Sequence, residues 1–382
     1  MKQTTTFLEF LENEKAGGLI LVFCAVLSLV LTNSPVGVRY AAFWTRPVAG
    51  EGLEHWVNDG LMAIFFLLIG LELKRELIEG ELSYRKTALL PVIAALGGMV
   101  VPATIHLSLN AGTATQPGAG IPIATDIAFA IGALSLLGKR VPASLMIFLT
   151  ALAVIDDLGA IVTIAIFYST GLSLINLGIA AGVFAVLLLF NRFRVHVLWP
   201  YLIGGVALWY FMLHTGIHAT LAGVFLAAVI PSKGGNSGSP SSILERFLEK
   251  PVAFIVLPLF ALVNTSIVIH PGWADGLWSS NSLGIIAGLV LGKPIGITLF
   301  SFIAVTVGVC TLPDNVNWKQ MIGAGCLGGI GFTMSIFITL LAFDDPELII
   351  ASKTAIMISS CVAGVIGYVW LRVLLRASRT AS

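Results

Sequence analysis

One apolar stretch places the strongest constraint on this chain. Residues Ala143–Tyr168 (ASLMIFLTALAVIDDLGAIVTIAIFY) contain two adjacent acids, Asp156 and Asp157, and no other charged residue. A helix needs about 20 apolar residues to cross the hydrocarbon core of a bilayer, and this stretch is long enough. An ionised carboxylate near the middle of a membrane costs roughly 2.5–3.5 kcal/mol on insertion scales. The pair is therefore expected to face an ion, a proton path or a countercharge.

The composition places the rest of the chain in a membrane as well. Of the 382 residues, 57% are hydrophobic and 11% are charged, whereas about 25% of the residues in soluble domains are charged. A soluble protein with so few charges would not stay in solution. The net charge of +1 comes without a basic tract or an aromatic platform, so nucleic acid is not an expected partner. We expect membrane lipid around the chain and no cofactor.

Hydropathy predicts an all-α polytopic membrane protein with about twelve spans. The spans begin near Gly17, Asp59, Ala88, Ile121, Ala143, Leu172, Val197, His214, Pro251, Ser282, Met321 and Ile349. The polar stretch Ser232–Ser242 (SKGGNSGSPSS) has the composition of a linker. We therefore predict a single transmembrane domain over residues 1–382, with eight spans in 1–231, a cytoplasmic linker in 232–250 and four spans in 251–382.

The loops predict the orientation, because basic residues favour the cytoplasmic side of a membrane. With the N-terminus inside, 17 of the 21 Lys and Arg residues fall in the cytoplasm, and Arg39, Arg46 and Lys353 fall outside. The remaining one, Lys293, falls within a span. Both termini are therefore predicted to lie in the cytoplasm, which agrees with an even number of spans.

Four charged residues remain at membrane depth when loops and span ends are set aside: Asp126, Asp156, Asp157 and Lys293. Left unpaired, they would cost on the order of 10–14 kcal/mol, which is comparable to the stability of a whole domain. A purely structural ion pair between one acid and Lys293 is an alternative explanation. Three acids against one lysine, however, leave two acids over. We expect these acids to hold a cation or to take up protons.

The surplus carboxylates suit a small hard cation, which prefers oxygen ligands. Burial and mutual repulsion favour the protonated acids, whereas Lys293 or a bound cation favours the ionised acids. Protons and the cation then compete for one site, and competition with alternating exposure is sufficient for antiport. Adjacent residues on a helix point about 100° apart. One of Asp156 and Asp157 is therefore expected to meet Lys293 while the other meets the ion.

Two spans contain helix-breaking residues. Asp126 lies in PGAGIPIATDIAFAIG, where two prolines and two glycines disfavour an unbroken helix, and the eleventh span contains the glycine-rich run CLGGIGFTMSIF. Broken helices expose backbone dipole ends at mid-membrane, and transporters place their binding sites there. Asp126 would favour the positive N-terminal ends and Lys293 the negative C-terminal ends. Lys293 is followed by Pro294, so its helix is expected to be distorted.

A second charged group, GLELKRELIEGEL, ends the second span at the cytoplasmic face. It comprises Glu72, Lys74, Arg75, Glu76 and Glu79. We interpret it as a solvated helix end, with an ion funnel or a pH-sensing cluster as the alternative. His218 could titrate near neutral pH, although a satisfied interfacial histidine is the favoured interpretation. Glu245 is predicted to be solvated, in a cytoplasmic loop or helix start.

At these residues the sequence resembles the NhaA family of bacterial sodium/proton antiporters. The segments that carry the resemblance are FFLLIGLELKREL, PIATDIAFAIGAL, LTALAVIDDLGAI, GIHATLAG, LGKPIGI and GGIGFTMSIF, in that order. The Asp-Asp pair with TDIAFA upstream and GKP downstream is the most specific part. The resemblance implies about twelve helices with inverted repeats, a known property of the family, and two crossed, interrupted helices in the fourth and eleventh spans.

The resemblance also implies roles for individual residues. Asp157 would be the principal ion and proton carboxylate, and Asp156 its partner, salt-bridged to Lys293 when the site is closed to the ion. Both acids would bind Na⁺ or Li⁺, and Thr125 and Asp126 would line the site at the helix break. The pH-response residues of the family would fall at Glu72, Glu76, His218 and Glu245.

At the level of the whole protein, the resemblance implies an electrogenic, pH-regulated antiporter of the bacterial inner membrane. It would export Na⁺ or Li⁺, driven by the inward movement of more protons than ions. Family members are homodimers that use an outward-facing β-hairpin between the first two spans. The corresponding stretch here, Val36–His55, shows no clear hairpin alternation. The residues themselves therefore do not predict a hairpin.

Two rival functions fit parts of the pattern. A sodium-coupled symporter for an organic solute could share the fold, but it would need a larger pocket, and the sequence indicates no further buried charge or polar cluster, which argues against a charged solute. An intramembrane aspartyl protease also uses two acids that share a proton. Those enzymes share a GxGD motif, however, and the acids here read ATDI and VIDD. We therefore do not expect an enzyme, and the trapped Lys293 suggests occlusion more than a channel.

Overall fold

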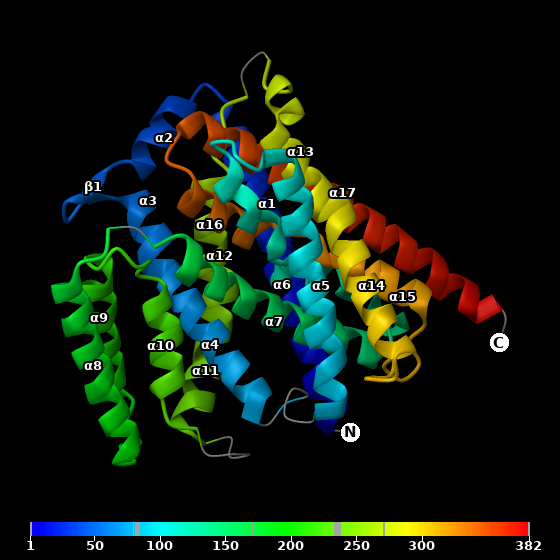
Figure 1. The fold of residues 1–382 in the computed structure, drawn as a ribbon, viewed down its shortest axis with the longest axis horizontal. Helices are drawn as coiled ribbons and strands as arrows, with labels where there is room; N and C mark the ends of the chain where they lie inside the picture. Colours follow the sequence, from blue (N-terminus) through cyan, green and yellow to red (C-terminus); the bar gives the residue numbers. More distant parts are fainter. Residues whose placement is uncertain are drawn as a thin grey trace. The chain divides into compact units, whose positions relative to one another are not determined.

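The computed structural model describes residues 2–78, 80, 85–169, 171–232, 238–269 and 272–380, and these residues are mostly helical (Figure 1). The α-helices are α1 (Lys2–Thr32), α2 (Gly37–Trp44), α3 (Leu53–His55), α4 (Met62–Ile78), α5 (Arg85–Asn110), α6 (Ile127–Ser135), α7 (Ala143–Phe167), α8 (Leu174–Arg192), α9 (Trp199–Leu213), α10 (Leu221–Val229), α11 (Pro240–Pro251), α12 (Leu257–Asn264), α13 (Ser280–Ala287), α14 (Lys293–Thr306), α15 (Trp318–Gly328), α16 (Phe332–Ala342) and α17 (Pro346–Thr380). The 3₁₀ segments are η3 (Gln116–Ile123), η4 (Gly138–Arg140) and η6 (Asp275–Trp278), and the π segments are η1 (Trp56–Leu61), η5 (Val252–Val256) and η7 (Gly288–Gly292). The strands are β1 (Pro47–Val48) and β2 (Glu51–Gly52).

Apolar helices confirm the multi-pass membrane fold. Within the described residues, eight helical stretches are long and apolar enough to cross a bilayer, and α15 with α16 makes a ninth if this pair, bent by 45°, counts as one span. Shorter helices, such as α9 with 15 residues and α10 with nine, fall below the length of a straight crossing. The count of about twelve spans therefore stays a prediction.

Both interruptions expected from prolines and glycines are present. The 3₁₀ segment η3 ends at Ile123, and α6 begins only at Ile127. In the other interrupted span, α15 ends at Gly328 and α16 begins at Phe332. The two breaks are joined directly, because the backbone N–H of Asp126 donates to the carbonyl of Ile330 at 2.6 Å. Sequence positions about 200 residues apart thus meet where both helices are open.

The chain forms two compact units, each assembled from separate parts of the sequence. The first unit comprises Met1–Val26, Tyr84–Ala160 and Ile267–Ser382, and the second comprises Leu27–Ser83 and Ile161–Ser266. The predicted single domain over residues 1–382, with its division into spans, stays a prediction. In the predicted linker 232–250, residues 233–237 lie outside the described residues. The rest is partly helical, because α11 begins at Pro240 and Ser239 caps it by accepting the N–H of Ser242.

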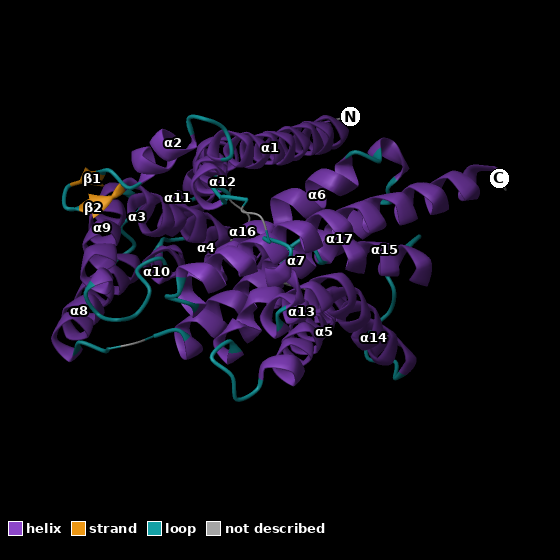
Figure 2. Cartoon of the chain, turned by 90° about the horizontal axis from the view of Figure 1, so that it is seen from above, coloured by secondary structure: helices purple, strands orange, loops and turns teal. Residues whose placement is uncertain are grey.

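A short β-hairpin lies where the sequence showed no hairpin alternation. Strands β1 and β2 pair antiparallel, with Pro47 opposite Gly52 and Val48 opposite Glu51, and Figure 2 shows them as the two orange arrows. The connecting residues Ala49 and Gly50 both have positive φ, 54° and 98°, as a type I′ turn requires. Strands of two residues are too short to give an alternating pattern, which explains why the sequence did not indicate them.

Close packing of α5 against α14 positions the residues of the first unit that matter most below (Figure 1). The two helices cross at Gly97 and Gly296, where a Cβ on either glycine would collide with the carbonyl oxygen of the other. Small residues allow membrane helices to approach this closely. Helix α14 begins at Lys293, and the Lys293 side chain runs past Gly98. The crossing of the two helices at these glycines therefore fixes the position of the Lys293 backbone.

Candidate ion-binding site

Asp126 lies at the joined breaks and caps two helices. Its Oδ1 accepts the N–H of Phe129 at 3.1 Å, so Asp126 is the N-cap of α6. Its Oδ2 accepts the backbone N–H and the hydroxyl of Thr333, in the first turn of α16, at 2.9 and 2.6 Å. The buried carboxylate thus faces the positive ends of two helices, the environment expected for it. Thr333 was not predicted; its position after the glycines of GGIGFTMS was the available signal.

Lys293, Asp156 and Thr125 form one hydrogen-bonded cluster in which all three side chains are 0% exposed. Lys293 makes an ion pair with Asp156 Oδ2 and also donates to Thr125 Oγ1 at 3.0 Å. The Thr125 hydroxyl lies 2.7 Å from Asp156 Oδ2 and 2.8 Å from the carbonyl oxygen of Gly328, the last residue of α15. The cluster therefore joins four elements of the first unit: the break before α6, α7, α14 and the end of α15.

The local sequence accounts for the position of the lysine. The π segment η7 precedes Lys293 directly, and Pro294 follows it. Proline lacks an N–H for the helical ladder, and single π turns often occur at functional sites. The expected distortion is present at this point. The lysine reaches the C-terminal end of α15 through Thr125, since Thr125 contacts both Lys293 Nζ and the Gly328 carbonyl.

The two adjacent acids differ in their surroundings. Asp156 makes the ion pair with Lys293, whereas Asp157, also buried, lies on the next helical position and acts on Lys293 electrostatically. Asp156 Oδ1 is buried and makes no hydrogen bond within the described part of the chain. A buried oxygen of this kind calls for a cation or a donor. The donor set of the cluster consists of carboxylate, hydroxyl and carbonyl oxygens, which suits a hard cation.

The described residues contain no set of side chains suited to a transition metal. In the described ranges, no three His, Cys, Asp or Glu side chains are grouped closely enough to hold a metal ion. The cluster of the first unit instead offers few ligands, and an amine competes for one of them.

The acidic residues proposed for a pH response lie in the second unit. Arg75 bridges two of them, with Nε 2.9 Å from Glu245 Oε1 and Nη2 3.1 Å from Glu76 Oε1. Glu245 is only 4% exposed and lies within α11, so the prediction that it is solvated was wrong. Glu72 is half-buried on the same helix as Glu76. Glu79 lies outside the described residues.

His218 lies between α9 and α10, also in the second unit. Its Nε2 is 2.9 Å from the carbonyl oxygen of Tyr168. This agrees with a satisfied interfacial histidine.

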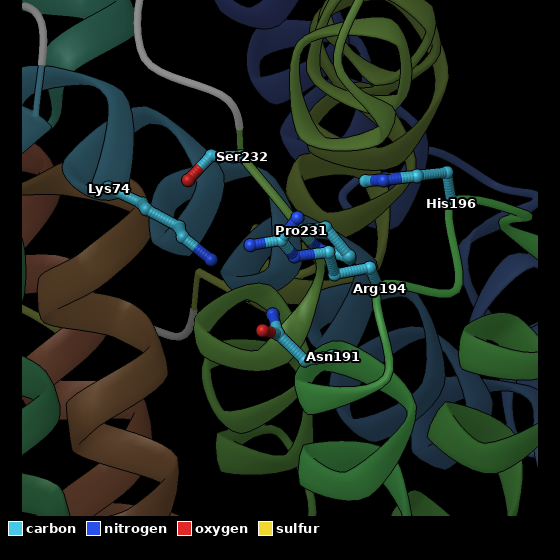
Figure 3. Close-up of a pocket in the computed structure, with 6 residues that line it drawn as sticks. All are labelled: Lys74, Asn191, Arg194, His196, Pro231 and Ser232. Atoms are coloured by element: carbon cyan, nitrogen blue, oxygen red, sulfur yellow. The ribbon is translucent and has the colours of Figure 1, made fainter.

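A cavity of about 620 Å³ opens beside α4 and the end of α10 in the second unit (Figure 3). It is lined by Lys74, Asn191, Arg194, His196, Pro231 and Ser232. Lys74 Nζ donates to the carbonyls of Ala228 and Ile230 at 2.8 and 2.6 Å, and so caps the C-terminal end of α10. The six lining residues include no carboxylate, so this basic cavity does not suit a cation. No pattern in the sequence indicated this cavity.

Comparison with known proteins identifies the family. A model of the Na⁺/H⁺ antiporter 1 family matches residues 8–371. The chain belongs to this family. It is 60% identical to the Na⁺/H⁺ antiporter NhaA of Cytophaga hutchinsonii, over 98% of this chain and 97% of that protein. It is 59% identical to NhaA 1 of Flavobacterium johnsoniae, over 99% and 100%, and 48% identical to NhaA of Escherichia coli O139:H28, over 97% and 98%.

Membership confirms the resemblance found in the sequence motifs. The match covers nearly the whole chain, so it includes both interrupted spans, the Asp-Asp pair and the lysine. The family is one of transporters. The chain is accordingly a multi-pass membrane protein of an antiporter family.

Proposed function

We propose that this chain exports Na⁺ or Li⁺ across the bacterial inner membrane in exchange for protons that move inward. The observation that carries the proposal is the buried cluster around Asp156. One oxygen of this carboxylate is held by Lys293 and Thr125, the other makes no hydrogen bond in the described part of the chain, and Asp157 follows directly. Membership of the Na⁺/H⁺ antiporter 1 family supports the same exchange.

Competition between the cation and protons follows from the electrostatics of the cluster. Asp157 acts as the principal ion and proton carboxylate, with Asp156 as its partner and Thr125 and Asp126 lining the site. When the site holds no cation, Lys293 neutralises Asp156 and a proton neutralises Asp157. A cation bound to both carboxylates neutralises the charge that attracts the ammonium of Lys293, and it also repels this ammonium. Binding of the cation therefore favours the loss of protons from the site.

The number of titratable groups allows an electrogenic exchange. Asp157 and Lys293 can each carry one proton that is lost when the cation binds. More than one proton can therefore move inward for each Na⁺ that leaves, and net charge crosses the membrane. The dipole ends at Asp126 stay neutralised throughout, because its hydrogen bonds are made to the backbone and side chain of Thr333 and to Phe129.

The proposed fold has about twelve spans arranged as inverted repeats, and its two interrupted spans cross where Asp126 meets Ile330. The strong bias of Lys and Arg toward one set of loops supports cytoplasmic termini. We further propose a homodimer. The exposed hairpin formed by β1 and β2 supports this assembly, because its short strands present a free edge to a second copy.

The proposed pH regulation involves the charged cluster around Arg75. Its guanidinium holds Glu76 and the buried Glu245 together, so protonation of either acid would loosen the contact between α4 and α11. Glu72 and His218 are included as weaker candidates. In this proposal, the cluster sets the pH at which exchange begins, and the cluster around Asp156 sets the affinity for the cation.

The test uses everted membrane vesicles that contain the protein and have been acidified by respiration. Na⁺, Li⁺ and K⁺ are added separately at several pH values, and dissipation of the proton gradient is followed. Na⁺ and Li⁺ are expected to release protons without any added solute, whereas K⁺ is not. The Asp157→Asn variant is expected to be inactive although it folds.

Two results would contradict the proposal. Full activity of the Asp157→Asn variant would exclude Asp157 as the principal carboxylate. A requirement for an organic solute, measured with purified protein in proteoliposomes, would favour the sodium-coupled symporter instead. Na⁺ binding that releases no protons at any pH in the working range would exclude competition at the site.

A further inference from the structure

A second buried polar chain lies in the first unit, separate from the ion cluster in its hydrogen bonds. It links His106 on α5, Asn281 on α13 and Ser352 on α17, all three fully or almost fully buried. His106 Nε2 lies 3.1 Å from Asn281 Oδ1, and Asn281 Nδ2 donates to Ser352 Oγ at 2.8 Å. Three helices that are distant in sequence are thus joined by side chains whose burial would be costly without partners.

The direction of the hydrogen bonds assigns the proton of the imidazole. Asn281 gives its amide hydrogen to Ser352, so the oxygen it turns to His106 can only accept. His106 must therefore donate from Nε2. Its other nitrogen, Nδ1, is buried and makes no hydrogen bond within the described part of the chain. In this series of hydrogen bonds, the histidine thus acts as a neutral donor.

The imidazole is clamped between η3 and α13. At Gly118 in η3, a Cβ would lie 3.0 Å from Asn281 Oδ1 and 3.1 Å from His106 Nε2. The backbone of Gly118 therefore packs directly against the two atoms of this hydrogen bond. At Gly284 in α13, a Cβ would lie 2.8 Å from His106 Cδ2. Side chains at either position would push the imidazole away. The contact therefore depends on the two glycines and on the hydrogen bond together.

A second link strengthens the same end of these segments. Asn110, at the end of α5, donates to the carbonyl of Ser280, at the start of α13, at 3.0 Å. Thr115, immediately before η3, donates to Asn110 Oδ1 at 2.7 Å. The polar side chains at the end of α5 therefore hold the starts of both η3 and α13.

Both of these segments lead into the ion cluster. Two residues after η3 comes Thr125, and α13 continues through η7 to Lys293. Midway along, Gly288 packs against Pro122, since a Cβ on Gly288 would lie 2.7 Å from Pro122 Cβ. At the far ends, Lys293 donates to Thr125 at 3.0 Å. The two segments are thus held together at their starts, at their middles and in the site.

We propose that His106 is a positioning residue for the ion site. Through Asn281 and Ser352 it fixes η3 against α13 and α17, and it thereby sets the geometry between Thr125 and Lys293 at the other ends of these segments. The inference rests on the proposed exchange of Na⁺ for H⁺, because the geometry of the site is measured through that exchange. It adds a distant determinant of cation affinity that does not touch the ion.

The test compares His106→Leu with the conservative variant His106→Gln in proteoliposomes. The apparent KM for Na⁺ and the maximal rate are measured at one pH, together with the melting temperature. His106→Leu is expected to raise KM by about three- to tenfold while the maximal rate changes by less than about twofold. His106→Gln can donate to Asn281 from its amide, so its KM is expected to stay within about twofold of wild type.

A third variant, Ser352→Ala, removes the last link without a change that would prevent folding. Its KM is expected to rise in the same direction by about two- to threefold, and it decides the question if His106→Leu does not fold. A wild-type KM in His106→Leu, with a lowered melting temperature, would show a merely structural role and overturn the proposal. A wild-type KM in Ser352→Ala, when His106→Leu cannot be purified, would overturn it as well.

The glutamine variant provides a further way to refute the idea. If His106→Gln raises KM as much as His106→Leu does, the hydrogen bond is not the cause and the proposal fails. Failure of the proposed exchange is recognised separately, because the wild-type protein would then show no Na⁺-dependent proton movement in the same vesicles. The positioning role alone fails when wild-type exchange is present and KM does not respond.

Discussion

The ion pair between Lys293 and Asp156 gives the sharpest test of how the buried charges are balanced. Both side chains are fully buried, and Lys293 is among the largest side chains with no exposed surface. In Lys293→Ala, the Thr125 hydroxyl is the one donor that Asp156 keeps within the described residues. Removing one partner of a buried pair typically costs about 3–5 kcal/mol, because the other charge is left uncompensated. We expect a loss of stability of this size.

Thermal unfolding of the purified protein in detergent measures this loss. At about 2 °C per kcal/mol for a long chain, the melting temperature of Lys293→Ala is expected to fall by about 6–10 °C. Lys319 is exposed, so Lys319→Ala serves as the matched control and is expected to melt like the wild type. The measurement is made near neutral pH, where an ionised Asp156 would be left without its countercharge.

A double variant separates the charge from the lost volume. When Asp156→Asn is added to Lys293→Ala, the carboxylate that lost its partner is removed as well, and replacing both partners of a buried pair is often close to neutral. Most of the lost melting temperature is therefore expected to return. Wild-type melting of Lys293→Ala, or a double variant that melts no higher than the single variant, would refute the reasoning.

The remaining predictions concern the charged cluster of the second unit and the capped helix breaks. Neutralising the cluster with Glu72→Gln and Glu76→Gln is expected to shift the pH dependence of exchange more than the apparent KM for Na⁺; an unchanged pH profile in the vesicle assay would exclude these two acids from the pH response. Asp126→Ala removes the cap of α6 and two hydrogen bonds at α16 and is expected to cost about 2–3 kcal/mol in thermal unfolding. Thr333→Val keeps the backbone bond and loses only the hydroxyl, so a cost of about 1 kcal/mol is expected; equal losses in these two variants would contradict the double capping.

Several features of the site were accessible from the sequence because they depend on local chemistry. Asp126 stands between helix-breaking residues and the start of an apolar helix, which is the sequence context of an N-cap. Proline after Lys293 indicated a distorted helix, and η7 directly precedes the lysine. The existence of a buried ion pair followed from the cost of isolated charges in a membrane.

Other features depended on contacts that no local pattern contains. Glu245 is buried where α11 packs against α4, and there it pairs with Arg75 across 170 positions of sequence; an isolated α11 would expose this acid. The hairpin of β1 and β2 has strands of two residues, too short for any periodicity. His106 stands within an apolar helix, and only the approach of Asn281 makes it part of a polar chain.

By itself, the sequence determined that this chain spans a membrane, where two of its helices break and that Asp126, Asp156, Asp157 and Lys293 are buried. These properties are set by the length of apolar runs, by the backbone limits of proline and glycine, and by the cost of desolvating a charge. The local pattern left open which acid Lys293 meets; the resemblance implied Asp156, and the tertiary structure confirms this pair across 137 positions. Only the tertiary structure decided that Asp126 caps the second broken helix as well as its own. The reason is that the local sequence does not distinguish two neighbouring acids on a helix, and packing determines which of them the lysine can reach.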